Sequence, residues 1–279
     1  MGYCGPGLHA TTDPVVLRTL FTAHVRMVTT ALGREHTAAH RRRLLRNLAT
    51  VATLAGRLAY EDLGDAASGR AYYSVAADSA REANDHQAAT IALGYTAQLA
   101  HAEGMTTAAL NHLAAALAHA GWAPAVVPWL ASIQATMCAD SGDHTAADAL
   151  DRAEPTTSQL ATQPADHGPA HLIATIGHVH LQAGNHSAAR AALTAALDQL
   201  PPTARRARIV ALTDLAMTEL HTGELSNACR HAITAADLLH RAPHATGATR
   251  LRAFRATAAR PIGPRALCAL DEYLTHLAA

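Results

Sequence analysis

Residues 89–120 of the chain read ATIALGYTAQLAHAEGMTTAALNHLAAALAHA, and this stretch decides the fold. Two alanine-rich segments lie on either side of Gly104, and glycine readily adopts the left-handed conformation that ends an α-helix. Two small residues, Ala97 and Ala109, stand seven positions before and five positions after that glycine. Side chains this small let two antiparallel helices approach closely. The stretch therefore predicts a helical hairpin with its turn at Gly104.

The same arrangement recurs along the chain. Successive turn glycines are separated by 40, 38, 42 and 39 residues, and they are Gly64, Gly104, Gly142, Gly184 and Gly223. The position five residues after each turn is small, and holds Gly69, Ala109, Ala147, Ala189 or Ala228. The facing position seven residues before the last four turns holds Ala97, Ala135, Gly177 or Ala216. This pattern predicts an all-α fold, a TPR-like α-solenoid with about twelve or thirteen helices in a right-handed superhelix of helical hairpins.

The first hairpin departs from the pattern because Arg57 stands at the facing position and Gly56 is next to it. One extra residue near Glu61-Asp62 would restore the alignment, and it would form a bulge in that helix. The side chains that can cap the second helices of the hairpins are Asp65, Asp143 and Asn185. Asp13-Pro14 resembles a helix N-cap followed by proline at the first helical position.

Residues 1–13 are expected to be a flexible N-terminus, and residues 14–279 a single TPR-like helical repeat domain. We expect two helices over 14–62 with a turn near Gly33, and loops at 119–128 and 155–169, which are rich in turn-forming residues. Helices are also expected at about 203–222, 225–241 and 245–259, with a last one after Gly263-Pro264.

Composition excludes several classes of protein. The 279 residues hold 22 basic residues, all arginine, and 22 acidic residues, and alanine makes up about a quarter of the chain. An all-β fold is excluded because alanine is the best helix former and aromatic residues are only 4%. Zero net charge disfavours a strongly basic nucleic-acid binder. A hydrophobic fraction of 49% is too high for a disordered chain.

Cysteine usage and the N-terminal sequence favour the cytoplasm. The four cysteines, Cys4, Cys138, Cys229 and Cys268, are far apart and form no CxxC pair, as expected of a reduced compartment. Residues 1–12 have neither a basic segment nor an apolar one, so they do not resemble a secretion signal. The uncharged stretch between Glu103 and Asp140 has no run of 18 apolar residues, so we expect two buried helices there rather than a membrane span.

Four segments carry a resemblance that is more specific than the repeat. They are LRNLATVATLAGRLAYEDLGDAASGRAYYSVAADSAREANDHQAATIALGYTAQLAHAEG (45–104), ADSGDHTAADALDRAE (139–154), LTAALDQLPPTARRARIVALTDLAMTELHTGELSNACRHA (193–232) and RLRAFRATAARPIGPRALCALDEYL (250–274). Together they resemble the TPR-like C-terminal sensor domain of XRE-type helix-turn-helix transcriptional regulators of GC-rich bacteria. The resemblance covers roughly residues 14–279 and implies an array that senses a ligand or partner. Residues 1–13 offer no counterpart of the preceding DNA-binding domain, so DNA binding is not carried over. The polar loop 155–169 also departs from the family, where aromatic residues are expected.

In TPR arrays the first helix of each hairpin lines the concave surface. Counting back from each turn glycine places a polar, sparsely charged set there, with two aromatic neighbours. This predicted groove consists of Arg57, Glu61, Tyr95, Gln98, His101, Trp129, Ser132, Thr136, His178, Gln182, Thr213, Met217 and His221. Such a surface suits a protein or peptide partner or a small-molecule signal. Trp129, with Trp122, is also a candidate for the core between repeats.

No motif in the sequence indicates catalysis, a cofactor or a metal. His36/His40 and His167/His171 have i,i+4 spacing, but neither pair has a third ligand at a recognised spacing. We therefore expect a non-catalytic regulatory protein in transcriptional or signalling control, and a homodimer is possible. The main alternative is a DNA-associated regulator that acts through a partner chain or through its arginine clusters (41–46, 205–208 and 250–260). We expect those clusters instead to be solvated helix faces paired with acids. An enzyme, or an accessory to one, built on the solenoid is a second alternative.

Overall fold

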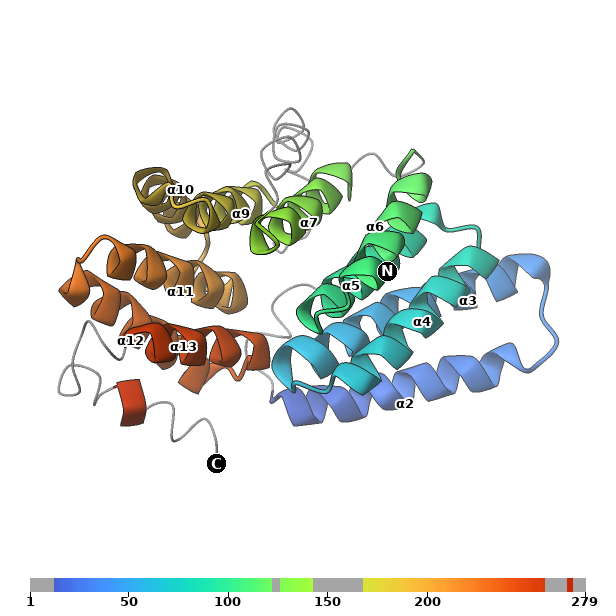
Figure 1. Ribbon diagram of the computed structural model, residues 1–279. Coiled ribbons are helices and arrows are strands. Elements are labelled where there is room, and N and C mark those ends of the chain that lie inside the picture. Colours follow the sequence, from blue (N-terminus) through green and yellow to red (C-terminus); the bar gives the residue numbers. More distant parts are fainter. Residues whose placement is uncertain (1–12, 122–125, 143–167, 259–269, 273–279) are drawn as a thin grey trace. The chain divides into compact units, whose positions relative to one another are not determined.

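The computed structural model describes residues 13–121, 126–142, 168–258 and 270–272. Within these residues the chain is all-α, with eleven α-helices and one π-helical turn. Consecutive helices form antiparallel pairs (Figure 1), an arrangement consistent with a helical-repeat solenoid. The predicted fold class is thus confirmed.

Two compact units divide the chain, and each is described by itself. The N-terminal unit, Thr12–Ile133, contains α2 (Pro14–Leu32), α3 (Ala38–Arg57), a π-turn (Leu58–Asp62), α4 (Ala66–Glu82), α5 (His86–Ala102), α6 (Thr106–Ala120) and the start of α7 (Val127–Asp140). The C-terminal unit, Gln134–Ala279, contains the end of α7, α9 (Pro169–Gln182), α10 (His186–Gln199), α11 (Arg205–His221), α12 (Leu225–Arg241) and α13 (Ala245–Ala258). The single domain over 14–279 stays a prediction.

All five predicted turn glycines have positive φ, between 68° and 82°. At Gly104 the amide of Met105 donates to the carbonyl of Ala100 at 2.9 Å, which is the bond that closes a Schellman turn. At Gly223 the amide of Glu224 bonds the carbonyl of Glu219 in the same way, also at 2.9 Å. The repeat therefore fixes the hairpin turns as expected. A further left-handed residue, Asn84 (φ 51°), joins α4 to α5 and was not predicted.

The predicted small residues lie where helices meet. Ala97, Ala109, Ala216 and Ala228 are all fully buried. A Cβ added at Gly177 would stand 2.5 Å from Leu193 Cγ, which is too close for any larger residue. Helix crossings in both units therefore depend on the absence of side-chain bulk.

A π-turn forms at the predicted bulge. Residues Leu58–Asp62 are π-helical, and the amide of Leu63 reaches back five residues to the carbonyl of Leu58 at 3.1 Å. The turn absorbs one extra residue and leaves Gly56 facing Gly69, since the Gly56 carbonyl lies 3.5 Å from the place of a Gly69 Cβ. The expected insertion is confirmed.

The predicted helix caps are confirmed in part. Asp13 accepts from the amide of Val15 at 2.8 Å and Pro14 begins α2, while Asp65 accepts from the amide of Ser68 at 3.0 Å. Asn185 is the N-cap residue of α10, but its side chain makes no capping hydrogen bond, so that prediction is wrong. Asp143 lies outside the described residues.

Helix boundaries follow the prediction closely in most places. The loop expected over 119–128 is shorter, because α6 continues to Ala120 and α7 begins at Val127, so that Pro128 lies inside the first turn of the helix. Residues 1–12, almost all of the 155–169 loop, and the segment with Gly263-Pro264 lie outside the described residues. Among the helices that are described, none combines the length and apolar character needed to cross a membrane.

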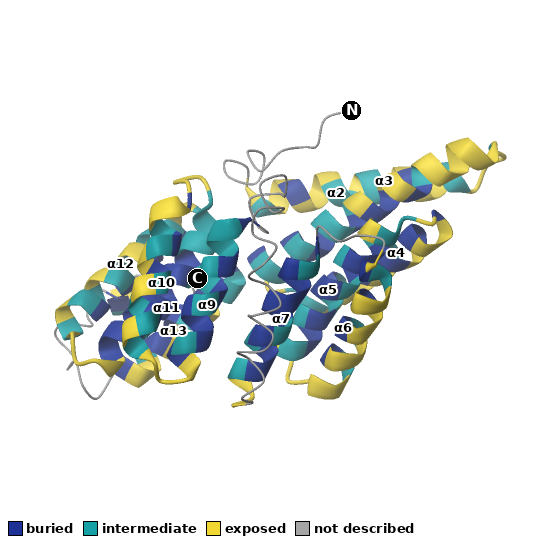
Figure 2. Cartoon of the chain, turned by 90° about the horizontal axis from the view of Figure 1, so that it is seen from above, coloured by how far each residue is buried: buried dark blue, intermediate teal, exposed yellow. Residues whose placement is uncertain are grey.

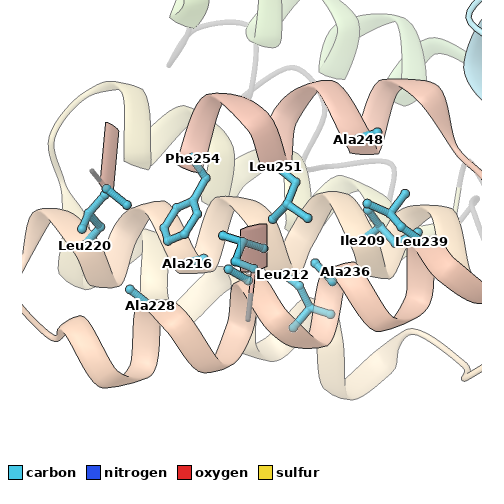
Figure 3. Close-up of a cluster of buried hydrophobic side chains, with 14 residues drawn as sticks. Ile209, Leu212, Ala216, Leu220, Ala228, Ala236, Leu239, Ala248, Leu251 and Phe254 are labelled. Carbon is cyan, nitrogen blue, oxygen red and sulfur yellow. The ribbon is translucent and has the colours of Figure 1, made fainter. Parts of the chain in front are cut away.

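The interiors are built largely from alanine and leucine. In the N-terminal unit, Ala52, Ala76 and Ala92 form one buried cluster between α3, α4 and α5. In the C-terminal unit a buried cluster lies between α11, α12 and α13, where Ile209, Leu239, Leu251 and Phe254 gather around alanines (Figure 3). Figure 2 shows that buried residues face the neighbouring helices in each unit.

Candidate functional site

The predicted groove residues fall into three groups by exposure. Half-buried positions that keep contact with solvent are Arg57, Glu61, Gln98, His101, Thr136 and Met217. Exposed positions are Gln182 and His221. Buried positions are Tyr95, Trp129, Ser132, His178 and Thr213. The buried members do not present a free surface: the hydroxyls of Ser132 and Thr213, for example, donate to backbone carbonyls of their own helices.

The N-terminal unit brings four predicted residues together beside the π-turn. Arg57 Nη2 lies 3.2 Å from Glu61 Oε2, and the two side chains are 13% and 19% exposed. The Arg57 guanidinium carbon lies 5.0 Å from the centre of the Tyr95 ring, within the range of a cation–π contact. The Tyr95 ring in turn meets Trp129, with ring centres 5.0 Å apart. This group is an aromatic floor under a half-buried ion pair.

Trp129 reaches this position because α5 has no side chain at Gly94. A Cβ there would stand 2.5 Å from the Trp129 ring. Trp129 is 3% exposed, so it belongs to the core between repeats, which is one of the two roles predicted for it. Trp122 lies outside the described residues.

Tyr73 forms the other edge of the floor and was missed by the prediction. Its ring stacks on Tyr95 at 5.7 Å, and it fits against α3 because Gly56 has no Cβ. The hydroxyl of Tyr73 is buried and has no hydrogen-bond partner among the described residues. Burial, aided by the negative charge of Glu61, raises the pKa of Tyr73 well above its ordinary value. The phenol therefore stays neutral at every physiological pH.

The C-terminal unit holds a charged network that draws on four helices. His178 on α9 bonds Asp140 on α7 through Nε2 at 2.9 Å and Asp214 on α11 through Nδ1 at 3.1 Å. Arg250 on α13 donates to both oxygens of Asp214, at 2.9 and 3.1 Å. The side chains of His178 and Asp214 are only 8% and 11% exposed. Of these four residues, only His178 was predicted as a site residue.

The network keeps His178 charged. Burial by itself lowers the pKa of His178, but the charge of Asp214 and hydrogen bonds to both carboxylates outweigh burial and raise that pKa to about 9. For Asp214 burial acts to raise the pKa, and the charges of Arg250 and His178 outweigh it and hold the pKa below the ordinary value. Both imidazole nitrogens then carry protons that are donated to carboxylates. No lone pair remains on the ring for accepting a proton or binding a metal.

Several arginines of the predicted clusters pair with acids. Arg41 contacts Glu82, and Arg46 lies 3.5 Å from Asp85. Arg190, outside those clusters, makes a bidentate pair with the buried Glu219 at 2.7 Å. Other arginines of α2 and α3 are exposed, and some of them make no ion pair within the described residues.

Several of the described histidines meet in pairs. The rings of His36 and His40 lie 4.8 Å apart, and those of His186 and His221 lie 5.2 Å apart. In the described part of the chain no three or more histidine, cysteine, aspartate or glutamate side chains are placed to hold a metal ion. His167 lies outside the described residues. Cys138 is buried and Cys229 half-buried, and neither is in a disulfide.

No protein-family model matches this chain, and a search of curated proteins finds no similar sequence.

Proposed function

We propose that the protein is a non-catalytic regulatory module whose repeat helices bind a protein, peptide or small-molecule signal. Its kinship with the TPR-like sensor domains of XRE-type transcriptional regulators, and its location in the cytoplasm, are part of the same proposal. The observation that carries it is the Arg57–Glu61 pair above Tyr95, which combines charge, partial burial and access to solvent.

A half-buried ion pair on an aromatic floor is suited to reversible recognition. A carboxylate of a ligand would replace Glu61 as the partner of Arg57, since the planar guanidinium binds carboxylates in a bidentate manner. Gln98 and His101 follow Tyr95 on α5 and are also half-buried, so they would supply further polar contacts to a peptide backbone. π-helical turns are frequent at functional sites, and Glu61 lies within one.

Repeat architecture offers a way to transmit binding. Each hairpin contacts mainly its neighbours, so small rotations add along an array. A ligand that separates Glu61 from Arg57 would change the contact between α3 and α5, which Arg57 makes over the Tyr95 ring. The expected regulatory output is a change in helix packing within the N-terminal unit.

Selection from a random peptide library displayed on phage, together with a thermal-shift screen of small carboxylates, would test this proposal on the full chain. Selected ligands should bind the Arg57→Gln variant about tenfold more weakly, equivalent to about 1.4 kcal/mol. The matched control is Arg81→Gln, because Arg81 also pairs with a nearby acid, Asp78, but on the exposed face of α4. Failure to recover any ligand, or equal binding to both variants, would contradict the proposal.

A further inference from the structure

The first helix, α2, exposes an unusual amount of apolar surface. Val15, Val16, Leu20 and Met27 are between 49% and 60% exposed. They account for four of the seven large hydrophobic side chains that are exposed in the described chain. Figure 2 shows α2 as a largely exposed helix. Its inward side, by contrast, buries Leu17 and Val28.

Three of these residues line up on the outer side of α2. Val16, Leu20 and Met27 fall in one row with Ala23 and Thr30, at steps of four, three, four and three residues, and all five are exposed. We call this row the α2 stripe. Alternating steps of three and four are the spacing of the contact positions in a coiled coil. The stripe therefore has the geometry of a seam to which a second helix can be packed.

Positive charge borders the stripe on both sides. Arg26 is exposed on α2 itself. On the other side His24 hydrogen-bonds Asn47 of α3 at 2.8 Å, and Arg43 stands one helical turn before Asn47, so it lies along the same edge. Neither Arg26 nor Arg43 makes an ion pair among the described residues, and Pro14–Leu32 contains no acidic residue.

Positive charge is concentrated in the N-terminal part of the chain, although the net charge of the whole chain is zero. Residues 13–57 hold eight arginines and two acidic residues, whereas the rest of the chain holds 14 arginines and 20 acidic residues. Three of the eight, Arg41, Arg46 and Arg57, are paired with acids. The five exposed arginines without an ion pair in the described structure are Arg18, Arg26, Arg34, Arg42 and Arg43.

We propose that the α2 stripe is a docking surface for an amphipathic helix of a partner protein, with apolar residues at its contact positions and aspartate or glutamate beside them. The apolar row would provide burial, and charge complementarity with Arg26 and Arg43 would select the partner. This surface is separate from the predicted groove, no member of which lies on α2. The inference does not depend on the proposed function.

Other occupants fit the stripe less well. A second copy of α2 would bring arginines against arginines, because this helix has no acid to offer. An anionic membrane favours a wide apolar face with aromatic residues, whereas this row is narrow and contains no aromatic residue. A nucleic-acid backbone would leave Val16, Leu20 and Met27 without a role.

A designed peptide of about three heptads, with leucine at the contact positions and glutamate beside them, provides the probe. Its binding to the full chain would be measured by fluorescence anisotropy. The peptide should bind at least about tenfold more tightly than a matched peptide with lysine in place of glutamate, and than a scrambled acidic peptide. Leu20→Ser with Met27→Ser should weaken binding by about tenfold, whereas Leu110→Ser, at an exposed leucine of α6, should not.

A charge swap distinguishes a lost docking surface from a misfolded protein, because a misfolded protein would lose binding and would not reverse its preference. Arg26→Glu with Arg43→Glu should reverse the preference, so that the lysine peptide binds more tightly than the glutamate peptide. The proposal would be overturned if the scrambled acidic peptide bound as tightly as the designed glutamate peptide. Binding to anionic vesicles or duplex DNA that is lost in the Leu20/Met27 variant, or a dimer in sedimentation equilibrium that the same variant dissociates, would also overturn it.

Discussion

The two units join their helices with different chemistry. In the N-terminal unit, the rings of Tyr73, Tyr95 and Trp129 from three helices pack against one another. In the C-terminal unit, helices α7, α9, α11 and α13 are linked by a network of four charged side chains centred on His178. Both units use the same glycine turns and small residues at helix crossings. The hairpin scaffold therefore leaves the chemistry between successive hairpins free to vary.

This difference implies different responses to the environment. The buried phenol of Tyr73 stays neutral at physiological pH, whereas the contribution of a buried imidazolium depends on pH. Trp129 packs against Tyr95 within the N-terminal unit. The fluorescence of Trp129 therefore follows that unit, while far-UV circular dichroism follows both.

The largest effect is expected from breaking the charged network. Asp214→Ala leaves His178 and Arg250 without their shared carboxylate, and removal of one partner from a buried ion network costs about 3–5 kcal/mol. Asp78→Ala removes an exposed partner of Arg81 and should change stability by less than about 1 kcal/mol. Urea unfolding followed by circular dichroism compares the two. If the two variants lost the same free energy of unfolding, the network would not be what stabilises the C-terminal unit.

The pH dependence comes next in size. The pKa of His178 is about 9 in the folded chain, above the ordinary 6.5, so its charge stabilises the fold fully below pH 6.5. That stabilisation is lost as pH rises from 6.5 through about 9. Its size is about 3 kcal/mol. Denaturant midpoints at several pH values should show this loss in the wild type but not in His178→Gln, and an identical pH profile would refute the assignment.

A smaller effect is expected from overpacking the aromatic group. Gly94→Ala forces a methyl group against the Trp129 ring, and we expect a loss of about 1–3 kcal/mol. Gly121→Ala is the control, because nothing lies within 4 Å of its Cβ position. Fluorescence-detected unfolding should register the first change and little of the second. Unchanged stability of Gly94→Ala would show that the Trp129 ring can move aside.

The smallest effect concerns the helix caps. Asp65→Ala removes a side chain that accepts a capping hydrogen bond at the start of α4, and should cost about 1 kcal/mol. Asn185→Ala removes a side chain without such a bond. It should cost only about a few tenths of a kcal/mol, because only the general preference for asparagine over alanine at the N-cap position is lost. Thermal unfolding of the two variants measures the contrast, and the reverse order would contradict the capping geometry.

The sequence was sufficient for the features that depend on single residues. Turn glycines, small residues at crossings and the extra residue before Gly64 each impose a local backbone requirement, so a pattern in the chain reveals them. Asn84 escaped because asparagine adopts the left-handed conformation less often than glycine. Its neighbour Asp85, which caps α5, was a usable signal.

The charged network could not be predicted in the same way. Asp140, His178, Asp214 and Arg250 follow one another at 38, 36 and 36 residues, close to the repeat length, and that spacing was the available signal. Whether these side chains meet depends on the rotation of each helix about its axis. Counting back from a turn leaves that rotation uncertain, which is also why Thr213 and Ser132 were placed in the groove although they are buried.

The glycine turns have a further consequence for the chemistry of the chain. At Gly104 and Gly223 nothing lies within 4 Å of an added Cβ, and φ is +74° and +82°. Glycine is thus required there because the backbone is left-handed, and not because the turn lacks room for a side chain. A mirror-image amino acid such as D-alanine prefers that same backbone angle, so a semisynthetic chain carrying it at these two turns should fold as before. Such a chain would have fewer unfolded conformations to lose, and would resist proteases that recognise only L-residues.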